Sequence, residues 1–112
     1  MRETATSGFT ARPAQRLTLW LDVRDRHRHA SLEVEVMKRA RRAKLLGATV
    51  FEGQMGFGTH GQLHREHVFS DDRPLSIVIV DVPERIQQFL GELAYLGRDI
   101  VATVEDVEIV DL

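Results

Sequence analysis

The sequence contains no cysteine, which excludes a disulfide-stabilised fold and any metal or catalytic site built on a thiolate. Its apolar runs, such as Ile77–Val80 and Ile100–Ala102, are far shorter than the roughly 20 residues that span a bilayer. Met1–Gln15 has no apolar stretch of the kind that a secretory signal needs. We therefore expect a cytoplasmic protein that is not itself embedded in a membrane.

The chain also lacks an excess of basic residues. It carries 15 Lys and Arg against 17 Asp and Glu, for a formal net charge of -2, and a domain with pI ≈ 6.2 is not typical of nucleic-acid-binding proteins. The charge is nevertheless uneven, because residues 24–44 hold eight basic and three acidic residues whereas residues 81–112 hold two and eight. This asymmetry favours charge complementarity within or between subunits over a nucleic-acid partner.

Common catalytic and phosphate-binding motifs are missing as well. No Gly-Lys-Ser or Gly-Lys-Thr is present, which excludes a Walker-type loop, and the Gly-x-Gly at Gly56–Gly58 does not open a helix as a dinucleotide-binding motif does. No serine occupies a nucleophile elbow. The adjacent carboxylates Asp71 and Asp72 are typical of a solvated turn. We therefore predict that the protein is not an enzyme.

The chain has the length of a single domain, 112 residues. Residues 1–15 are small and polar, and they predict a disordered N-terminal arm, because they bury too little apolar surface to offset their ordering entropy. The folded domain is expected to span residues 16–112.

Four segments of this domain have the residue pattern of strands. Leu17–Val23 alternates apolar and polar residues, Ala48–Glu52 is β-branched and aromatic, Leu75–Asp81 is densely apolar, and Ile100–Val110 supplies the last strand. The charges and imidazoles of Arg24–His29 predict a loop.

Two segments have the spacing of amphipathic helices. The first begins after Ser31, which suits an N-cap, and ends near Gly47, which suits a left-handed C-terminal residue. The second begins at Pro83 and is closed by Gly97. Apolar residues recur about once per turn: Leu32, Val36, Met37, Ala40 and Ala43 in the first helix, and Ile86, Phe89, Leu90 and Leu93 in the second.

The order of these elements predicts an α+β fold, the ferredoxin-like βαββαβ sandwich, with a four-stranded antiparallel sheet and two helices on one face. The other face of the sheet would stay open. Trp20 and the run Ile77–Val80 place apolar side chains on that face, which a monomer would expose to water. We therefore predict a homo-oligomer packed through its open sheet faces; the alternative is a monomer whose N-terminal arm covers Trp20.

The connection Gly53–Pro74 is far longer than the usual two to six residues, and such loops are commonly functional. Glycines at Gly56, Gly58 and Gly61 let backbone amides approach an anion or turn with a positive φ. In a second interpretation these glycines only shape a β-hairpin.

The same connection contains His60, His64, Glu66 and His67, the one cluster in the sequence that resembles a set of metal ligands. In a helical conformation the three histidines would share one face, and zinc takes three or four such ligands. A metal-binding or metal-dependent hydrolytic protein is therefore the alternative function.

Several stretches resemble family 190 of the domains of unknown function, in the PII-like (GlnB-like) superfamily. They are Leu46–Gly53, Gly56-Phe57-Gly58, Gly61, His64, Asp72–Pro74 and Ile77–Asp81. The resemblance covers residues 16–112 and implies a ferredoxin-like subunit that assembles as a trimer, with the sheets lining its centre.

PII proteins bind adenine nucleotides in the clefts between subunits, and they use the long loop after the second strand to contact a partner, often a membrane transporter or an enzyme. Residues 53–73 would be this loop. PII proteins hold phosphate with a glycine- and lysine-rich turn after the second helix. In this sequence the corresponding turn is Gly97-Arg98-Asp99, where Arg98 is the residue that could bind a phosphate. The ligand-binding residues that the resemblance implies are Gly53, Gly56, Phe57, Gly58, Gly61, His64 and Arg98.

The leading hypothesis is thus a trimeric, PII-like regulatory protein that senses a small anionic ligand, such as an adenine nucleotide, and acts on a protein partner through the loop at residues 53–73. A third interpretation is a partner domain whose loop docks a protein without binding any small molecule.

Overall fold

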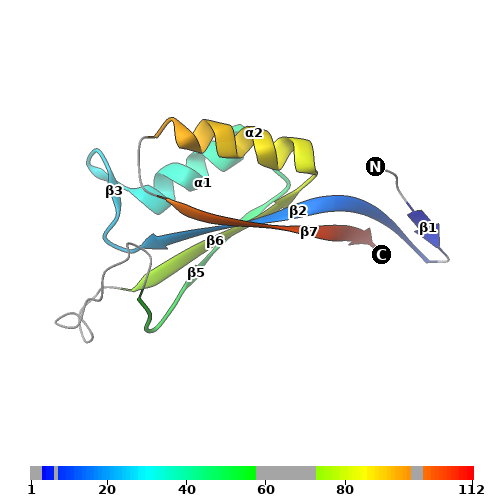
Figure 1. Cartoon of the computed structure of the whole chain (residues 1–112), viewed down its shortest axis with the longest axis horizontal. Coiled ribbons are helices and arrows are strands. Elements are labelled where there is room, and N and C mark those ends of the chain that lie inside the picture. The colour runs from blue at the N-terminus through cyan, green and yellow to red at the C-terminus, as the bar shows by residue number, and fades with distance from the viewer. Residues whose placement is uncertain (1–3, 7, 58–72, 97–99) are drawn as a thin grey trace.

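The computed structural model describes residues 4–6, 8–57, 73–96 and 100–112. Two helices lie against one face of an antiparallel sheet (Figure 1). In chain order the elements are β1 (Thr4–Thr6), β2 (Phe9–Asp22), β3 (Arg26–His27), β4 (Ala30–Ser31), α1 (Leu32–Arg42), β5 (Ala48–Glu52), β6 (Pro74–Asp81), α2 (Pro83–Ala94) and β7 (Val101–Asp111).

The sheet has the strand order of the predicted ferredoxin-like sandwich. Strand β2 lies in the middle, with β7 on one side and β6 on the other, and β5 forms the edge beyond β6. All of these pairs are antiparallel, so the prediction of a four-stranded antiparallel sheet with two helices on one face is confirmed. Short β1 pairs only with the first residues of β2.

The core lies between the helices and one face of the sheet. In β6, buried and half-buried residues alternate, so that Ile77 and Ile79 point toward the helices whereas Val78 and Val80 lie on the other face. This alternation follows from the period of two along a strand. The fully buried apolar side chains are Leu17, Leu19, Leu21, Val36, Ile77, Ile79, Ile86 and Phe89.

The open face of the sheet carries Trp20, as the sequence predicts, but of the run Ile77–Val80 only Val78 and Val80 lie on it. Its middle mixes apolar side chains with threonine and serine. Two cross-strand rows run over it, one of Phe51, Ser76, Trp20 and Val101 and one of Thr49, Val78, Thr18 and Thr103. Trp20 is 41% exposed, and its Nε1 donates a hydrogen bond to Oγ1 of Thr103 at 3.3 Å. Strand β1 pairs with residues 9–11, far along β2 from Trp20.

The first long strand begins earlier than the sequence predicts. We expected residues 1–15 to form an arm and the fold to start at Arg16, but β2 starts at Phe9, and Ala11 and Ala14 are buried. The early start of β2 depends on tertiary structure, because β7 pairs with Thr10–Trp20 of β2. The β2–β7 ribbon extends beyond the helices (Figure 1).

This ribbon makes the subunit elongated. The molecule measures 54 × 27 × 19 Å, and its radius of gyration is 16.1 Å, whereas a compact domain of this length has about 13 Å. A projecting two-stranded ribbon has few neighbours in its own subunit, and it is therefore available for contacts with another chain.

The ends of the first helix also differ from the prediction. Ser31 is the N-cap residue but makes no side-chain capping hydrogen bond, and α1 ends at Arg42, before Gly47. The left-handed residue is Lys44, with φ 59. The amide of Leu45 donates to the carbonyl of Ala40, which completes a Schellman-type end without a glycine.

The charged segment Arg24–His29 is not purely a loop. Its Arg26–His27 pairs with Ala30–Ser31 in the small hairpin β3–β4, and Arg28 in the turn has a positive φ of 59. The prediction for the second helix is confirmed at its start, where Pro83 occupies the first turn of α2.

Candidate functional site

The two ends of the long connection at residues 53–73 are fastened together at one corner of the sheet. The amide of Gly53 donates to the carbonyl of Pro74 at 2.8 Å, and the amide of Val23 donates to the carbonyl of Arg73 at 3.0 Å. The carboxylate of Glu52 pairs with the guanidinium of Arg73. The last residue of β5 is thereby held against the first residues of β6, so the connection leaves the sheet from a closed base.

Gly53 and Gly56 are required at this base for close approach. A Cβ atom on Gly53 would lie 2.7 Å from Cγ of Pro74, and one on Gly56 would lie 3.0 Å from the same atom. Neither has a positive φ, since Gly8 is the one glycine among the described residues that does. Of the roles that the sequence left open for Gly56, a turn with a positive φ is therefore not the one observed. The glycines instead leave room for the proline ring.

Two large apolar side chains among the described residues of this connection, those of Met55 and Phe57, point into solvent. Met55 is 74% exposed and Phe57 is 79% exposed, which is unusual for large apolar residues in a domain with a single core. Of the predicted ligand-binding residues, the structure brings Gly53 and Gly56 together against Pro74 at the base, and Phe57 lies just beyond it. The others, Gly58, Gly61, His64 and Arg98, lie outside the described residues, as do His60 and His67 of the metal hypothesis.

Replacing Gly53 with alanine is expected to lower the free energy of unfolding by about 1–3 kcal/mol, because the new methyl group overlaps the Pro74 ring. Urea unfolding would measure the effect. Gly47→Ala is the matched control, since no atom lies within 4 Å of the added Cβ, and it should be neutral or slightly stabilising. Equal losses in the two variants would contradict the proposed role of Gly53.

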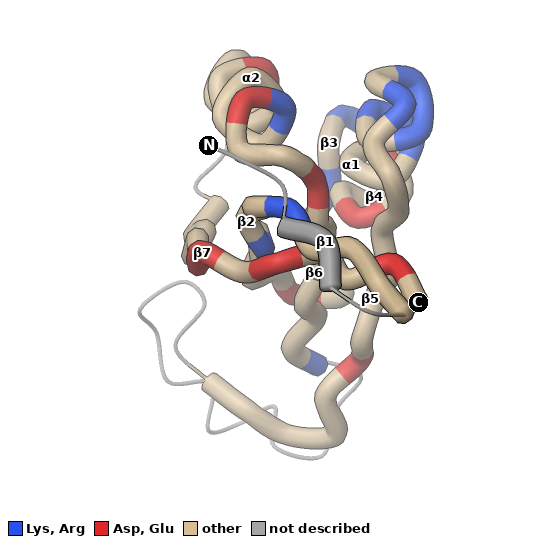
Figure 2. Tube along the Cα trace, turned by 90° about the vertical axis from the view of Figure 1, so that its right-hand side faces the viewer, with Lys and Arg blue, Asp and Glu red and all other residues tan. Residues whose placement is uncertain are grey.

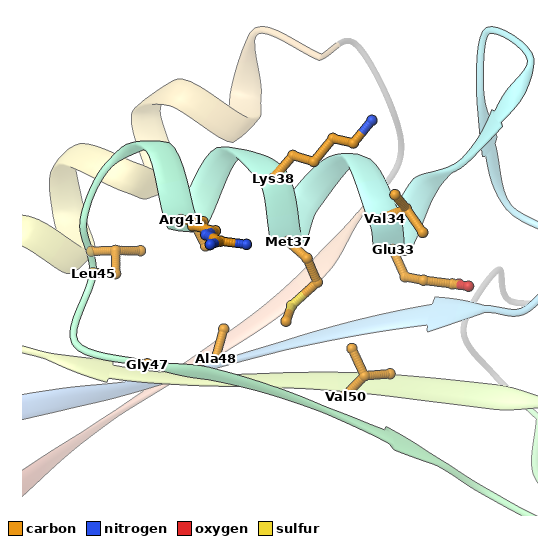
Figure 3. A pocket seen from close by; sticks show the side chains of 10 residues that line it. Glu33, Val34, Met37, Lys38, Arg41, Leu45, Gly47, Ala48 and Val50 are labelled. Carbon is orange, nitrogen blue, oxygen red and sulfur yellow. The ribbon is translucent and has the colours of Figure 1, made fainter.

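A pocket of about 490 Å³ lies between α1 and the edge strand β5. Figure 3 shows Met37 of the helix and Ala48 and Val50 of the strand pointing toward each other across it. The sequence carries no signal for this pocket, because its two walls are separate in sequence and each is an ordinary amphipathic segment. The lining residues are Glu33, Val34, Met37, Lys38, Ala40, Arg41, Leu45, Gly47, Ala48 and Val50.

Glu33 forms one end of this pocket. Burial raises the pKa of its carboxyl group, an effect that Arg26 partly offsets and that the charges of Glu52 and Asp25 reinforce. Its Oε2 is shielded from solvent and has no hydrogen-bond partner in the described part of the chain. Because Glu52 also pairs with Arg73, Glu33 connects the pocket electrostatically to the base of the long connection.

Glu33→Gln is expected to raise the melting temperature at pH 7. Folding raises the pKa of Glu33 above its usual 4.5, so the folded state loses stability as pH rises above 4.5 and the carboxyl group ionises. Glutamine mimics the protonated form and avoids this loss. The gain should shrink toward pH 4. Glu35→Gln should have the opposite sign at pH 7, because the hydrogen bond from Arg39 lowers the pKa of Glu35. Thermal unfolding between pH 4 and pH 8 would check both signs.

Charge is distributed unevenly over the subunit. Figure 2 shows basic positions gathered around α1 and the β3–β4 hairpin and acidic positions along β7. The last turn of α1 holds Arg39, Arg41 and Arg42, whereas β7 carries Glu105, Asp106, Glu108 and Asp111. The asymmetry in the sequence therefore becomes a separation in space.

Comparison with known proteins identifies the family. The DUF190 family, described as an uncharacterized ACR, matches residues 14–109. The chain belongs to the DUF190 family. A UPF0166 protein from Aquifex aeolicus (strain VF5) is 32% identical over 79 residues, which are 69% of this chain and 74% of that protein. The resemblance found in the sequence is thus confirmed.

Solved structures similar to this DUF190 protein are PII-like. CPII, a nitrogen regulatory PII-like protein from Thiomonas intermedia K12, in a structure bound to ADP, AMP and bicarbonate, has a TM-score of 0.62 and 20% identity over 88% of this chain and 90% of that one. A putative PII-like signaling protein from Thermus thermophilus has a TM-score of 0.61 and 19% identity, covering 88% and 91%. These similarities establish the fold.

Within the described residues of this DUF190 protein, no helix is both long and apolar enough to cross a membrane. The same part of the chain contains no group of three or more His, Cys, Asp or Glu side chains arranged to hold a metal ion. The described site thus has two features. One is the closed, glycine-containing base of the long connection, with exposed apolar side chains, and the other is the pocket between α1 and β5, which Lys38 and Arg41 line on its helical side.

Proposed function

We propose that this DUF190 protein is a homotrimeric, PII-like regulatory protein and not an enzyme. It binds a small anionic ligand, an adenine nucleotide, in the clefts between subunits and acts on a protein partner through residues 53–73. The observation that carries the proposal is the closed base of this connection, formed by Gly53, Gly56, Pro74 and the Glu52–Arg73 pair on a PII-like fold. Such a base fixes the point at which the connection departs from the subunit. In our proposal the part of the connection beyond this base responds to the ligand.

The open face of the sheet supports the trimer. It presents the exposed side chains of Phe51, Trp20 and Val101 in one row, with Ser76 between Phe51 and Trp20, and exposed apolar surface of this kind marks interaction sites. The projecting β2–β7 ribbon gives each subunit further surface to share with its neighbours. Three copies that pack their sheets around a common axis would bury both features.

The choice of an adenine nucleotide rests on the fold and on the residue types near the proposed cleft. CPII, which shares the fold, has been solved with ADP and AMP. In this chain Gly58 and Gly61 would offer backbone amides to a phosphate, and His64 and Arg98 would offer side-chain donors. Binding would change the population of conformations of residues 53–73, to the extent that the ligand prefers one of them.

The exposed side chains at the start of the connection support action on a protein. Met55 and Phe57 lie beyond the base with most of their surface in water, and aromatic residues and Met are enriched in protein interfaces. A membrane transporter or an enzyme is the kind of partner we expect them to contact.

Isothermal titration calorimetry against ATP, ADP, AMP and cyclic nucleotides would test the proposal. We expect one nucleotide per subunit and weaker binding in His64→Ala and Arg98→Ala, whereas His29→Ala, in the β3–β4 hairpin, should bind as the wild type does. If no nucleotide gives a heat of binding at protein concentrations well above micromolar, the proposal that the ligand is an adenine nucleotide is wrong.

Elemental analysis of untagged protein tests the metal-binding alternative. About one metal ion per subunit, lost in His64→Ala, would support that alternative instead.

A further inference from the structure

The pocket between α1 and β5 has the size and the walls of a small-molecule site. Ligand pockets usually measure about 300–1,000 Å³ and are mostly apolar, and this one measures about 490 Å³. Its walls are Met37 and Ala40 on the helix and Ala48 and Val50 on the strand (Figure 3). Val50 is 37% exposed, so an apolar occupant would remove this surface from water.

The polar groups around the pocket define the chemistry of its occupant. Lys38 and Arg41 line the helical side, and neither forms an ion pair with any described residue. The neighbouring Arg39, in contrast, is paired with Glu35 at 2.8 Å. Figure 3 shows the ammonium of Lys38 pointing away from β5, so Arg41 is the cation that the pocket offers to an occupant. A cation beside an apolar surface suits a molecule that joins an apolar body to a negative charge.

The opposite end of the pocket is Glu33, whose shielded Oε2 has no hydrogen-bond partner in the described residues. An anionic group placed beside this carboxylate would be repelled by its charge. The anionic group of an occupant would therefore lie toward Arg41, away from this carboxylate, and its apolar body would lie between the two.

We propose that the α1–β5 pocket binds a small amphipathic anion, a molecule with an apolar body and one carboxylate, sulfonate or phosphate group. The described walls of the site belong to a single subunit, and the proposal gives this site a ligand of its own, apart from the nucleotide. Of the predicted nucleotide-binding residues that the structure describes, Gly53, Gly56 and Phe57, none lines it.

Calorimetry with decanoate, below its micellar concentration, tests this site directly. We expect one decanoate per subunit and binding about tenfold weaker in Arg41→Gln, because a charge-assisted contact is lost. Arg42→Gln is the matched control: it removes the same charge from the next residue of α1, which does not line the pocket. Decanol, with the same apolar body and no charge, should bind more weakly than decanoate.

Val50→Trp separates the pocket from other apolar surfaces, since the larger side chain fills it from the edge strand. We expect decanoate binding to be lost in this variant while its circular dichroism spectrum is retained. No binding to the wild type, binding that persists in Val50→Trp, or equal affinity for decanol would overturn the proposal. Saturating ADP should leave decanoate binding unchanged, and displacement would overturn the assignment to a separate site. A failure of ADP itself to bind would count only against the proposed function.

Discussion

Asp81→Ala is expected to lower the free energy of unfolding by about 3 kcal/mol, the largest effect we predict for a single polar side chain. Asp81 is 2% exposed. Its Oδ2 accepts hydrogen bonds from the amide of Leu46 at 3.0 Å and from Nε of Arg85 at 3.2 Å, and its Oδ1 accepts one from the amide of Val82 at 2.7 Å. Alanine would leave both amides without their acceptor.

The same carboxylate connects the two helices. Nη2 of Arg85 donates to the carbonyl of Ala43 at 2.7 Å and to that of Lys44, so the pair Asp81–Arg85 joins the start of α2 to the end of α1. Asp81→Asn should cost less than alanine, because an amide oxygen can still accept one of the backbone hydrogen bonds. Urea unfolding would rank the variants.

Glu84→Ala is the matched control for Asp81→Ala. Glu84 is exposed in the first turn of the same helix, where a negative charge is worth about 0.3–1 kcal/mol through the helix dipole. A loss in Asp81→Ala no larger than this would show that the buried carboxylate does not hold the helices together.

Trp20→Glu is expected to convert the proposed trimer into monomers. Sedimentation at micromolar concentration should give the wild type about three times the 12.7 kDa subunit mass and the variant the mass of one subunit. Burying an unpaired carboxylate at an interface costs several kcal/mol, and each 1.4 kcal/mol weakens association tenfold. Because Trp20 is already 41% exposed in the subunit, the variant should still fold.

Tyr95→Glu controls for the added charge, since Tyr95 follows α2 and is 93% exposed; this variant should remain trimeric. A wild type that sediments as one subunit, or a trimer that survives Trp20→Glu, would show that the open face is not the interface. The nucleotide clefts would then lose their structural basis as well.

Much of the fold was predictable because it depends on patterns local to the chain. The alternation Leu17–Leu19–Leu21 specifies a strand with one buried face, and the same three residues are fully buried. Pro83 specifies the start of α2 through its fixed φ and missing amide. At the candidate site, the length of the connection and its glycines predict a loop between two strands, and the structure places the ends of this connection together at one corner of the sheet.

The roles of those glycines could not be predicted, because they depend on a residue distant in sequence. Gly53 and Gly56 meet the ring of Pro74, a contact that forms only when β5 pairs with β6. A glycine in a sequence commonly indicates a left-handed turn, but Gly53 and Gly56 instead leave space for the ring of Pro74.

The sequence alone determined the period of each strand and helix, their order and therefore the ferredoxin-like sandwich, since these follow from which face of each segment is apolar. Only the tertiary structure decided the details that depend on a partner element: β2 starts at Phe9 because β7 pairs with it, and Lys44 adopts a left-handed conformation where Arg85 binds its carbonyl. The α1–β5 pocket belongs to this second group, because a cavity exists only between walls that folding brings together.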